Sequence, residues 1–130
     1  MTEFTGRLIK KGNASGKALV SRKPLSFLGG IDPKTGNVID RESDIYGESV
    51  AGKVLVFPYG KGSTVGSYII LWLKKEGVSP TAIINESSEP IVCVGAIISD
   101  IPMVDKIDIS KIETGDDIII EGNKVTLSKG

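Results

Sequence analysis

The sequence predicts a β-rich α/β domain with mixed sheets, and three observations indicate this class. Short apolar runs alternate with glycine, proline and polar residues, which is typical of many short strands joined by turns. One segment after Val65 has the apolar spacing of a helix. The chain has 130 residues, enough for one domain with a core and too few for two ordinary ones, so we expect a single domain over residues 1–130.

The N-terminal half is expected to hold strands and one ordered loop. Residues 4–10 and 17–21 have strand character, and segment 11–16, rich in turn-forming residues, predicts a turn between them. Segment 24–37 mixes glycine and proline with apolar side chains, which indicates an ordered loop, and 38–40 begin a short extended piece. Residues 54–57 are all apolar, as expected of a central strand covered on both faces.

A helix is expected after this strand. Its apolar residues recur at i, i+3, i+4, i+7 and i+8, the spacing of one helix face: Val65, Tyr68, Ile69, Trp72 and Leu73. Lys74 and Lys75 suit the negative C-terminal end of a helix, and Gly77 suits the position after it.

The C-terminal half is expected to add short strands to the sheets. A strand at 82–84 is followed by apolar residues 90–94 and 96–98, with a short helix or turn about Gly95, and by a strand at 103–104. Residues 118–121 and 124–127 predict a hairpin, because Gly122-Asn123 is a typical two-residue turn.

Composition argues against several classes of function. Lys plus Arg and Asp plus Glu number 16 each, so the net charge is zero and no basic patch for nucleic acid stands out. There is no histidine, and the single Cys93 cannot hold an iron–sulfur cluster or a structural zinc alone. No segment has the pattern of a secretory leader or of a membrane span, so we expect a cytoplasmic protein without nucleic-acid or membrane partners.

The most informative segment is 57–68, where a strand end, a glycine-rich turn and a helix start follow one another. This layout directs free backbone N–H groups and the positive end of a helix toward an anion. It is not a nucleotide P-loop, because Gly62 follows Lys61 where that motif needs Ser or Thr. Ser63 can cap the helix, bind a carboxylate or phosphate, or transfer a proton, and the pattern alone leaves these roles open.

Other polar residues have plainer interpretations from their pattern. Gly30 and Asp32 fit a turn, or else a loop whose backbone approaches a ligand closely. Cys93 fits a small buried hydrophobe. Solvated loops are expected for four acidic residues: Glu86, Glu89, Asp105 and Asp108.

Three blocks that cover most of the chain resemble the small subunits of the aconitase X group. They are 24–36 (PLSFLGGIDPKTG), 52–68 (GKVLVFPYGKGSTVGSY), and a third block made of 89–92 (EPIV), 95–98 (GAII) and 101–104 (IPMV). The resemblance implies a swivelling β/β/α domain equivalent to the mobile domain of aconitases. It also implies a large catalytic subunit as partner, a [4Fe-4S] cluster held by that partner, and a small phosphorylated hydroxy acid as substrate.

The resemblance also assigns roles to residues of the glycine-rich turn. Ser63 corresponds to the family's proton acceptor, and no metal ligand is expected in this chain. We expect the substrate to be contacted by five further residues: Lys61, Gly62, Thr64, Gly30 and Asp32.

The implied reaction is dehydration of (R)-5-phosphomevalonate to trans-anhydromevalonate 5-phosphate in an archaeal-type mevalonate route to isoprenoids. A related bacterial branch dehydrates cis-3-hydroxy-L-proline, which is the alternative substrate. A different class of function is a non-catalytic anion-binding or carrier module. The lack of histidine counts against a phosphohistidine carrier.

Overall fold

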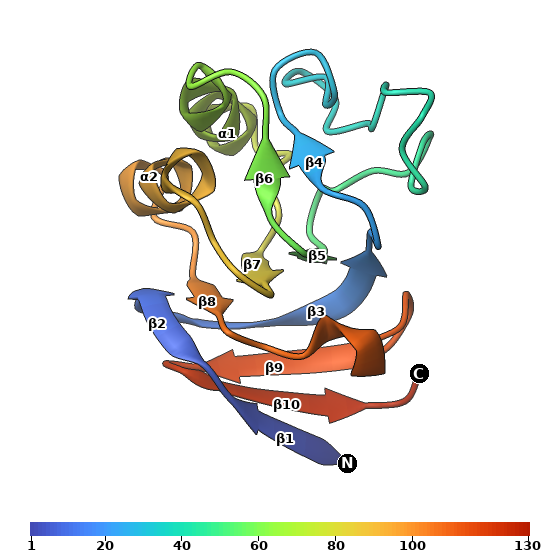
Figure 1. Cartoon of the computed structure of the whole chain (residues 1–130), viewed down its shortest axis with the longest axis vertical. Helices are drawn as coiled ribbons and strands as arrows, with labels where there is room; N and C mark the ends of the chain where they lie inside the picture. The colour runs from blue at the N-terminus through green and yellow to red at the C-terminus, as the bar shows by residue number, and fades with distance from the viewer.

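A computed structural model describes residues 1–130 and contains ten strands, two α-helices and one short 3₁₀ helix (Figure 1). The helices are α1 (Gly66–Lys75) and α2 (Pro90–Ile98), with the 3₁₀ helix η1 at Ile109–Lys111. The strands are β1 (Thr2–Thr5), β2 (Arg7–Lys10), β3 (Asn13–Val20), β4 (Leu25–Ser26), β5 (Val54–Phe57), β6 (Gly60–Lys61), β7 (Ala82–Asn85), β8 (Met103–Asp105), β9 (Asp117–Glu121) and β10 (Lys124–Ser128).

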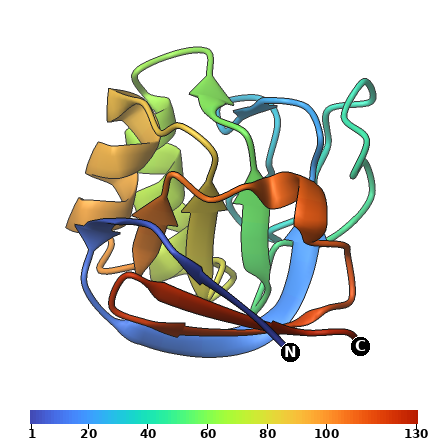
Figure 2. The same ribbon diagram turned by 60° about the horizontal axis from the view of Figure 1, so that its bottom comes forward.

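Eight strands form one mixed sheet in the order β1-β10-β9-β3-β5-β7-β8-β2, and β4 pairs with β6 in a second, two-stranded sheet. Residues 13–17 of β3 pair antiparallel with β9, whereas residues 18–20 pair parallel with β5. Strand β3 therefore belongs to two layers and bends between them (Figure 2). Strands β1 and β2 are consecutive in the chain but lie at opposite ends of the strand order, so the sheet nearly closes on itself.

Two N-terminal predictions are wrong at this point. The expected strand 4–10 is divided at Gly6, because β1 pairs with β10 and β2 pairs with β8. The expected turn at 11–16 is limited to its first residues, because residues 13–16 pair with β9 and belong to β3. Long-range pairing determines both features, and the local sequence pattern does not report it.

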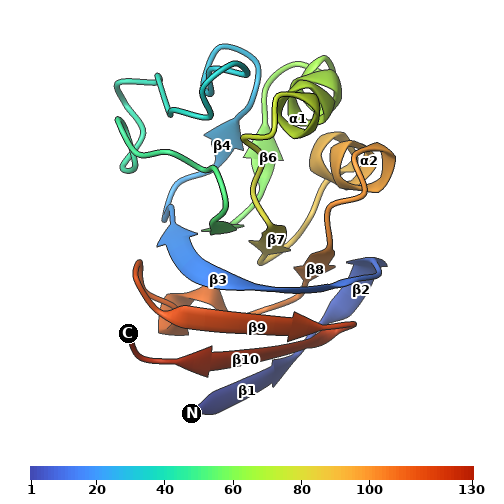
Figure 3. The same cartoon turned by 180° about the vertical axis from the view of Figure 1, so that it is seen from behind.

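The layers stack as helices, central strands and outer strands (Figures 1 and 3). Successive residues of β5 point to opposite faces: Leu55 and Phe57 join the core beneath the helices, and Val54 and Val56 join the core between the two β layers. Because both faces are covered, the strand is apolar throughout, as its sequence predicts. This confirms a β-rich β/β/α domain.

Helix α1 is confirmed, but its buried face differs from the predicted one. Ile69 and Leu73 are buried as expected, whereas Tyr68 is 67% and Trp72 is 41% exposed. Ile70, which widens the apolar arc in the sequence, is fully buried, since the helix packs against α2 as well as the sheet. An apolar stripe of α1 is thus left on the surface.

Helix α2 is one continuous helix of nine residues, where the sequence predicts two apolar pieces about Gly95. Its apolar residues surround the helix and leave no helical period to detect. Its first turn is capped by Glu89, whose carboxylate accepts the N–H groups of Ile91 and Val92, and Pro90 is its first residue. Neither α1 nor α2 has the length and apolar run that a membrane-spanning helix needs.

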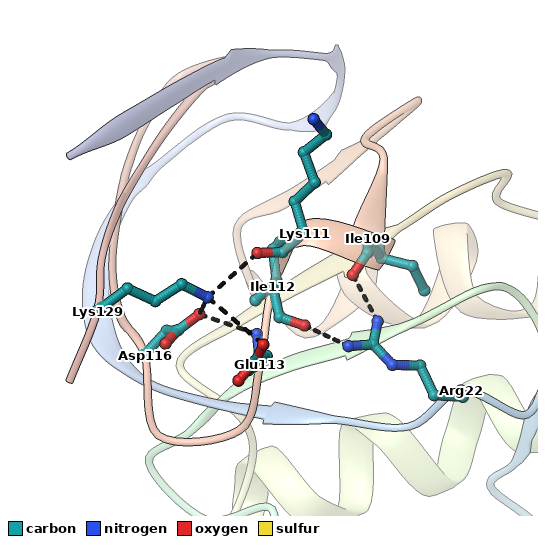
Figure 4. A network of polar contacts seen from close by, with 7 residues as sticks. All are labelled: Arg22, Ile109, Lys111, Ile112, Glu113, Asp116 and Lys129. Atoms are coloured by element: carbon teal, nitrogen blue, oxygen red, sulfur yellow. Dashed lines mark hydrogen bonds and ion pairs between the residues drawn. The ribbon is translucent and has the colours of Figure 1, made fainter.

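A polar network fastens the C-terminus to the η1 region (Figure 4). The Asp116 carboxylate accepts the N–H of Glu113 at 2.9 Å and the Nζ of Lys129 at 3.0 Å. Arg22 donates to the carbonyls of Ile109 and Ile112, both at 2.6 Å. These bonds tie the segment after β3 and the residue after β10 to the η1 region.

The Asp116 network predicts a loss of stability in acid. Burial alone would raise the pKa of Asp116, but the Glu113 N–H and Lys129 outweigh burial and hold this pKa below its usual range. A lowered folded-state pKa gives stability that is complete above the unfolded value, near pH 4, and is lost as pH falls through the folded value. We expect Asp116→Asn to unfold at lower urea concentration at pH 7 and to lose less further stability below pH 4 than the wild type. Equal losses in acid would contradict the assignment.

Candidate active site

The Ser63 loop joins the end of the central strand β5 to helix α1. It leaves β5 at Pro58, pairs briefly with β4 through β6, and reaches α1 at Gly66. The side chains of Lys61, Ser63 and Thr64 are exposed. The predicted arrangement of strand, glycine turn and helix is therefore confirmed, and Ser63 lies on the surface where a ligand can reach it.

Backbone N–H groups are left free around Ser63. Those of Gly62, Ser63 and Thr64 donate to no acceptor in the chain. The N–H of Val65 donates to the Ser63 Oγ at 3.1 Å. Three consecutive unpaired donors just before a helix N-terminus are available to bind an anion.

Ser63 is not the N-cap residue of α1. That position is Val65, which offers no side-chain cap, and the helix is preceded by a turn in which the Gly66 N–H donates to the Ser63 carbonyl at 2.9 Å. The hydroxyl of Ser63 contributes one hydrogen bond to this turn. The helix-capping role that the sequence left open is therefore reduced to this one hydrogen bond, and it does not explain the free N–H groups.

Gly30 and Gly62 converge on Ser26 of β4. A Cβ on Gly30 would clash with the Ser26 carbonyl oxygen of the same loop, and a Cβ on Gly62 would lie 2.6 Å from the Ser26 Oγ. The contact at Gly62 shows that the Ser63 loop passes close to Ser26. The sequence did not single out Ser26, although it stands in one of the blocks that carry the family resemblance.

Thr64 and Asp32, two of the predicted substrate contacts, line two separate hollows. Thr64 lines one of about 240 Å³ between the start of α1 and the start of α2. Asp32 lines another of about 470 Å³ beside Trp72 of α1. The Asp32 carboxylate accepts the Lys34 N–H at 2.9 Å, as in a turn, and Lys61 has no ion-pair or hydrogen-bond partner for its Nζ.

Asp105 is not on a solvated loop, and that prediction is wrong. It is the last residue of β8 and is fully buried. Arg7 donates to both of its carboxylate oxygens, at 2.9 and 2.7 Å, and Ser88 donates its hydroxyl and its N–H. Burial alone would raise the pKa of Asp105, but these hydrogen bonds outweigh it and hold the pKa below its usual range.

The positions of the other acidic residues and of the thiol are closer to those that the sequence predicts. Glu86 is exposed as predicted, whereas the half-buried Glu89 caps α2. Asp108 is exposed and caps η1 through Ser110. Cys93 is half-buried and packs against the core beneath the helices, close to the small hydrophobe expected.

This chain has no set of residues that could hold the iron–sulfur cluster, which the resemblance assigns to the partner. No group of three or more His, Cys, Asp or Glu residues could hold a metal ion, and Cys93 is the only thiol. Such clusters take several thiolate ligands. No step of the chemistry is therefore assigned to a cluster on this chain.

The β/β/α layers and the exposed loop after the central strand β5 fit the fold that the aconitase X resemblance implies. Residues 3–128 match the aconitase X swivel domain, and the chain belongs to this family. The family resemblance stated from the sequence is thereby confirmed.

Individual relatives cover nearly the whole chain. It is 63% identical to the phosphomevalonate dehydratase small subunit of Thermococcus sibiricus, over 92% of each chain. It is 57% identical to the protein of that name from Methanocaldococcus jannaschii, over 93% of this chain and 92% of that one. The crystal structure of Thermococcus kodakaraensis aconitase X in its holo-form superposes with a TM-score of 0.97, at 56% identity, covering 98% of this chain and 99% of that one.

Proposed function

We propose that this chain is the small subunit of a phosphomevalonate dehydratase, a hydro-lyase that converts (R)-5-phosphomevalonate to trans-anhydromevalonate 5-phosphate and water. Relatives of that name share 57 to 64% of their residues with it over most of their length. The name small subunit implies a large-subunit partner. One cysteine and no histidine support the assignment of the cluster to that partner. The cytoplasm is the proposed compartment.

Ser63 is the proposed base, and the groups around its hydroxyl are proposed to stabilise its oxyanion. Ser63, as its alkoxide, takes the proton from the carbon next to the substrate carboxylate, the carbon–carbon double bond forms, and the carbon–oxygen bond to the hydroxyl breaks. The departing hydroxide would be accepted by the cluster on the partner, and it leaves as water together with the proton that Ser63 took up. A serine hydroxyl is a weak base unless its oxyanion is stabilised. The Val65 N–H already donates to the Ser63 Oγ, and the helix start and the unpaired Lys61 add positive potential.

The surrounding residues would hold the substrate. The N–H groups of Gly62 and Thr64 suit a carboxylate, which accepts several hydrogen bonds at once. Lys61 supplies charge without a competing partner. Gly30 allows its loop to approach the substrate closely, and Asp32 keeps one carboxylate oxygen free after its bond to Lys34. These contacts remain predictions.

The test is anaerobic turnover by this chain mixed with the large subunit from the same organism, after reconstitution of the cluster. We expect NMR to detect dehydration of 5-phosphomevalonate only when both chains are present. Turnover of cis-3-hydroxy-L-proline instead would keep the mechanism and change the substrate. A stable two-chain complex that turns over neither compound would overturn the enzymatic assignment, and anion binding by the isolated chain would then favour a binding module.

A further inference from the structure

A buried polar network lies at the end of β8 and takes no part in the proposed proton transfer. Asp105 is fully buried at the end of β8, and Arg7 of β2 neutralises it through two hydrogen bonds. Ser88, in the loop between β7 and α2, donates both its hydroxyl and its N–H to the second carboxylate oxygen. The Asp105 carboxylate thus links β2, the end of β8 and the loop between β7 and α2.

The segment held by Asp105 contacts the start of the Ser63 loop. The N–H groups of Glu86 and Ser87 both donate to the Pro58 carbonyl at 3.1 Å. The Glu89 carboxylate lies against Gly60, where an added Cβ would approach the Glu89 Oε1 to 2.5 Å. Displacement of Ser88 would therefore move the residues that support positions 58 and 60.

The first turn of α2, which Glu89 caps, also contacts the end of the Ser63 loop. The hydroxyl of Ser67 donates to the Ile91 carbonyl at 2.6 Å. A Cβ on Gly66 would lie 3.1 Å from the Ile91 Cγ2. The first turn of α2 thus holds the Ser63 loop on both sides, at Gly60 and at Gly66, while residues 61–65 themselves are exposed.

We propose that Arg7, Asp105 and Ser88 are positioning residues that fix the first turn of α2 and, through it, the Ser63 loop. The inference rests on the proposed function for its catalytic consequence. The structural link between Ser88 and the Ser63 loop rests only on the hydrogen bonds and close contacts described above. A buried, paired carboxylate is suited to this task, because moving it away from its partners leaves a charge without compensation.

Ser88→Ala tests the link with a small change, since the N–H of residue 88 still donates to Asp105. We expect kcat of the two-chain enzyme to fall about tenfold with KM within about twofold, a loss of about 1.4 kcal/mol in transition-state stabilisation. We also expect the backbone amide NMR signals of Gly62, Ser63 and Thr64 to shift in the full-length chain. Ser88→Thr, which keeps the hydroxyl, should restore both.

Ser110→Ala is the matched control. Ser110 donates its hydroxyl at 2.6 Å and its N–H at 3.1 Å to Asp108, the same pair of bonds as at Ser88, but on the exposed η1 helix. It should leave kcat and the loop signals unchanged. Arg7→Lys, which keeps the charge and loses the two-pronged bond, should repeat the effect of Ser88→Ala in milder form.

The two readouts separate the positioning role from the proposed function. Loop signals that stay in place in Ser88→Ala and in Arg7→Lys would overturn the positioning role, whatever the turnover. Loop signals that shift together with a fall in kcat support it. A wild-type enzyme without turnover would refute the proposed function, and the amide signals would still decide whether this network fixes the loop.

Discussion

Replacement of Ser63 by alanine is expected to lower turnover of the two-chain enzyme by about a thousandfold, within the range that a general base contributes. The reason is the position of its hydroxyl, which is exposed, accepts one N–H bond and is followed by a helix start. The expected change in stability is below about 1 kcal/mol, because only that hydrogen bond to Val65 is lost. Single-turnover kinetics and urea unfolding measure the two effects.

Ser43→Ala is the matched control for this change. The Ser43 Oγ accepts the Ile45 N–H at 3.2 Å, the same turn geometry as at Ser63, in the long loop between β4 and β5. It should reproduce any small loss of stability and leave turnover intact. Near-wild-type turnover in Ser63→Ala would remove this serine from the mechanism and leave its loop as a binding element.

Local sequence signals predicted the elements that define the site. The apolar run of β5, the two glycines beside Ser63 and the helical spacing of α1 all occur within twenty residues. Each is a short-range property of the chain. The hairpin of β9 and β10 was found for the same reason, since Gly122-Asn123 determines its turn and register.

Features that depend on distant partners could not be predicted in this way. Arg7 and Asp105 are 98 positions apart, and nothing near Asp105 indicates that an arginine will cover it. The helical state of α2 has a local signal that was missed, because Glu89 followed by Pro90 is a typical helix start. Ile70 widens the apolar arc of α1, which predicts cover on more than one side, and α2 supplies that cover; the exposure of Tyr68 and Trp72 was not predicted.

The role of the free N–H groups is tested by Gly62→Ala. Gly62 has φ of 92°, a region that L side chains rarely adopt, and an added Cβ would lie 2.6 Å from the Ser26 Oγ. The Ser26 hydroxyl can rotate away, but the positive φ disfavours alanine, and we expect the loop to relax in a way that reorients the N–H groups of residues 62–64. We expect turnover to fall by about a hundredfold, the loss found when one oxyanion donor is removed, and stability to fall by about 1–3 kcal/mol.

Gly115→Ala separates the strain from the loss of the anion site. Gly115 has φ of 96°, and no atom lies within 4 Å of a Cβ built there, in the turn before β9. This variant should share the backbone strain and keep its turnover. Equal turnover in the two variants, measured at substrate saturation with both chains folded, would mean that the N–H groups around Ser63 do not act in the reaction. A selective loss in Gly62→Ala would place the stabilisation of charge on the backbone of this loop, with Ser63 as the group that moves the proton.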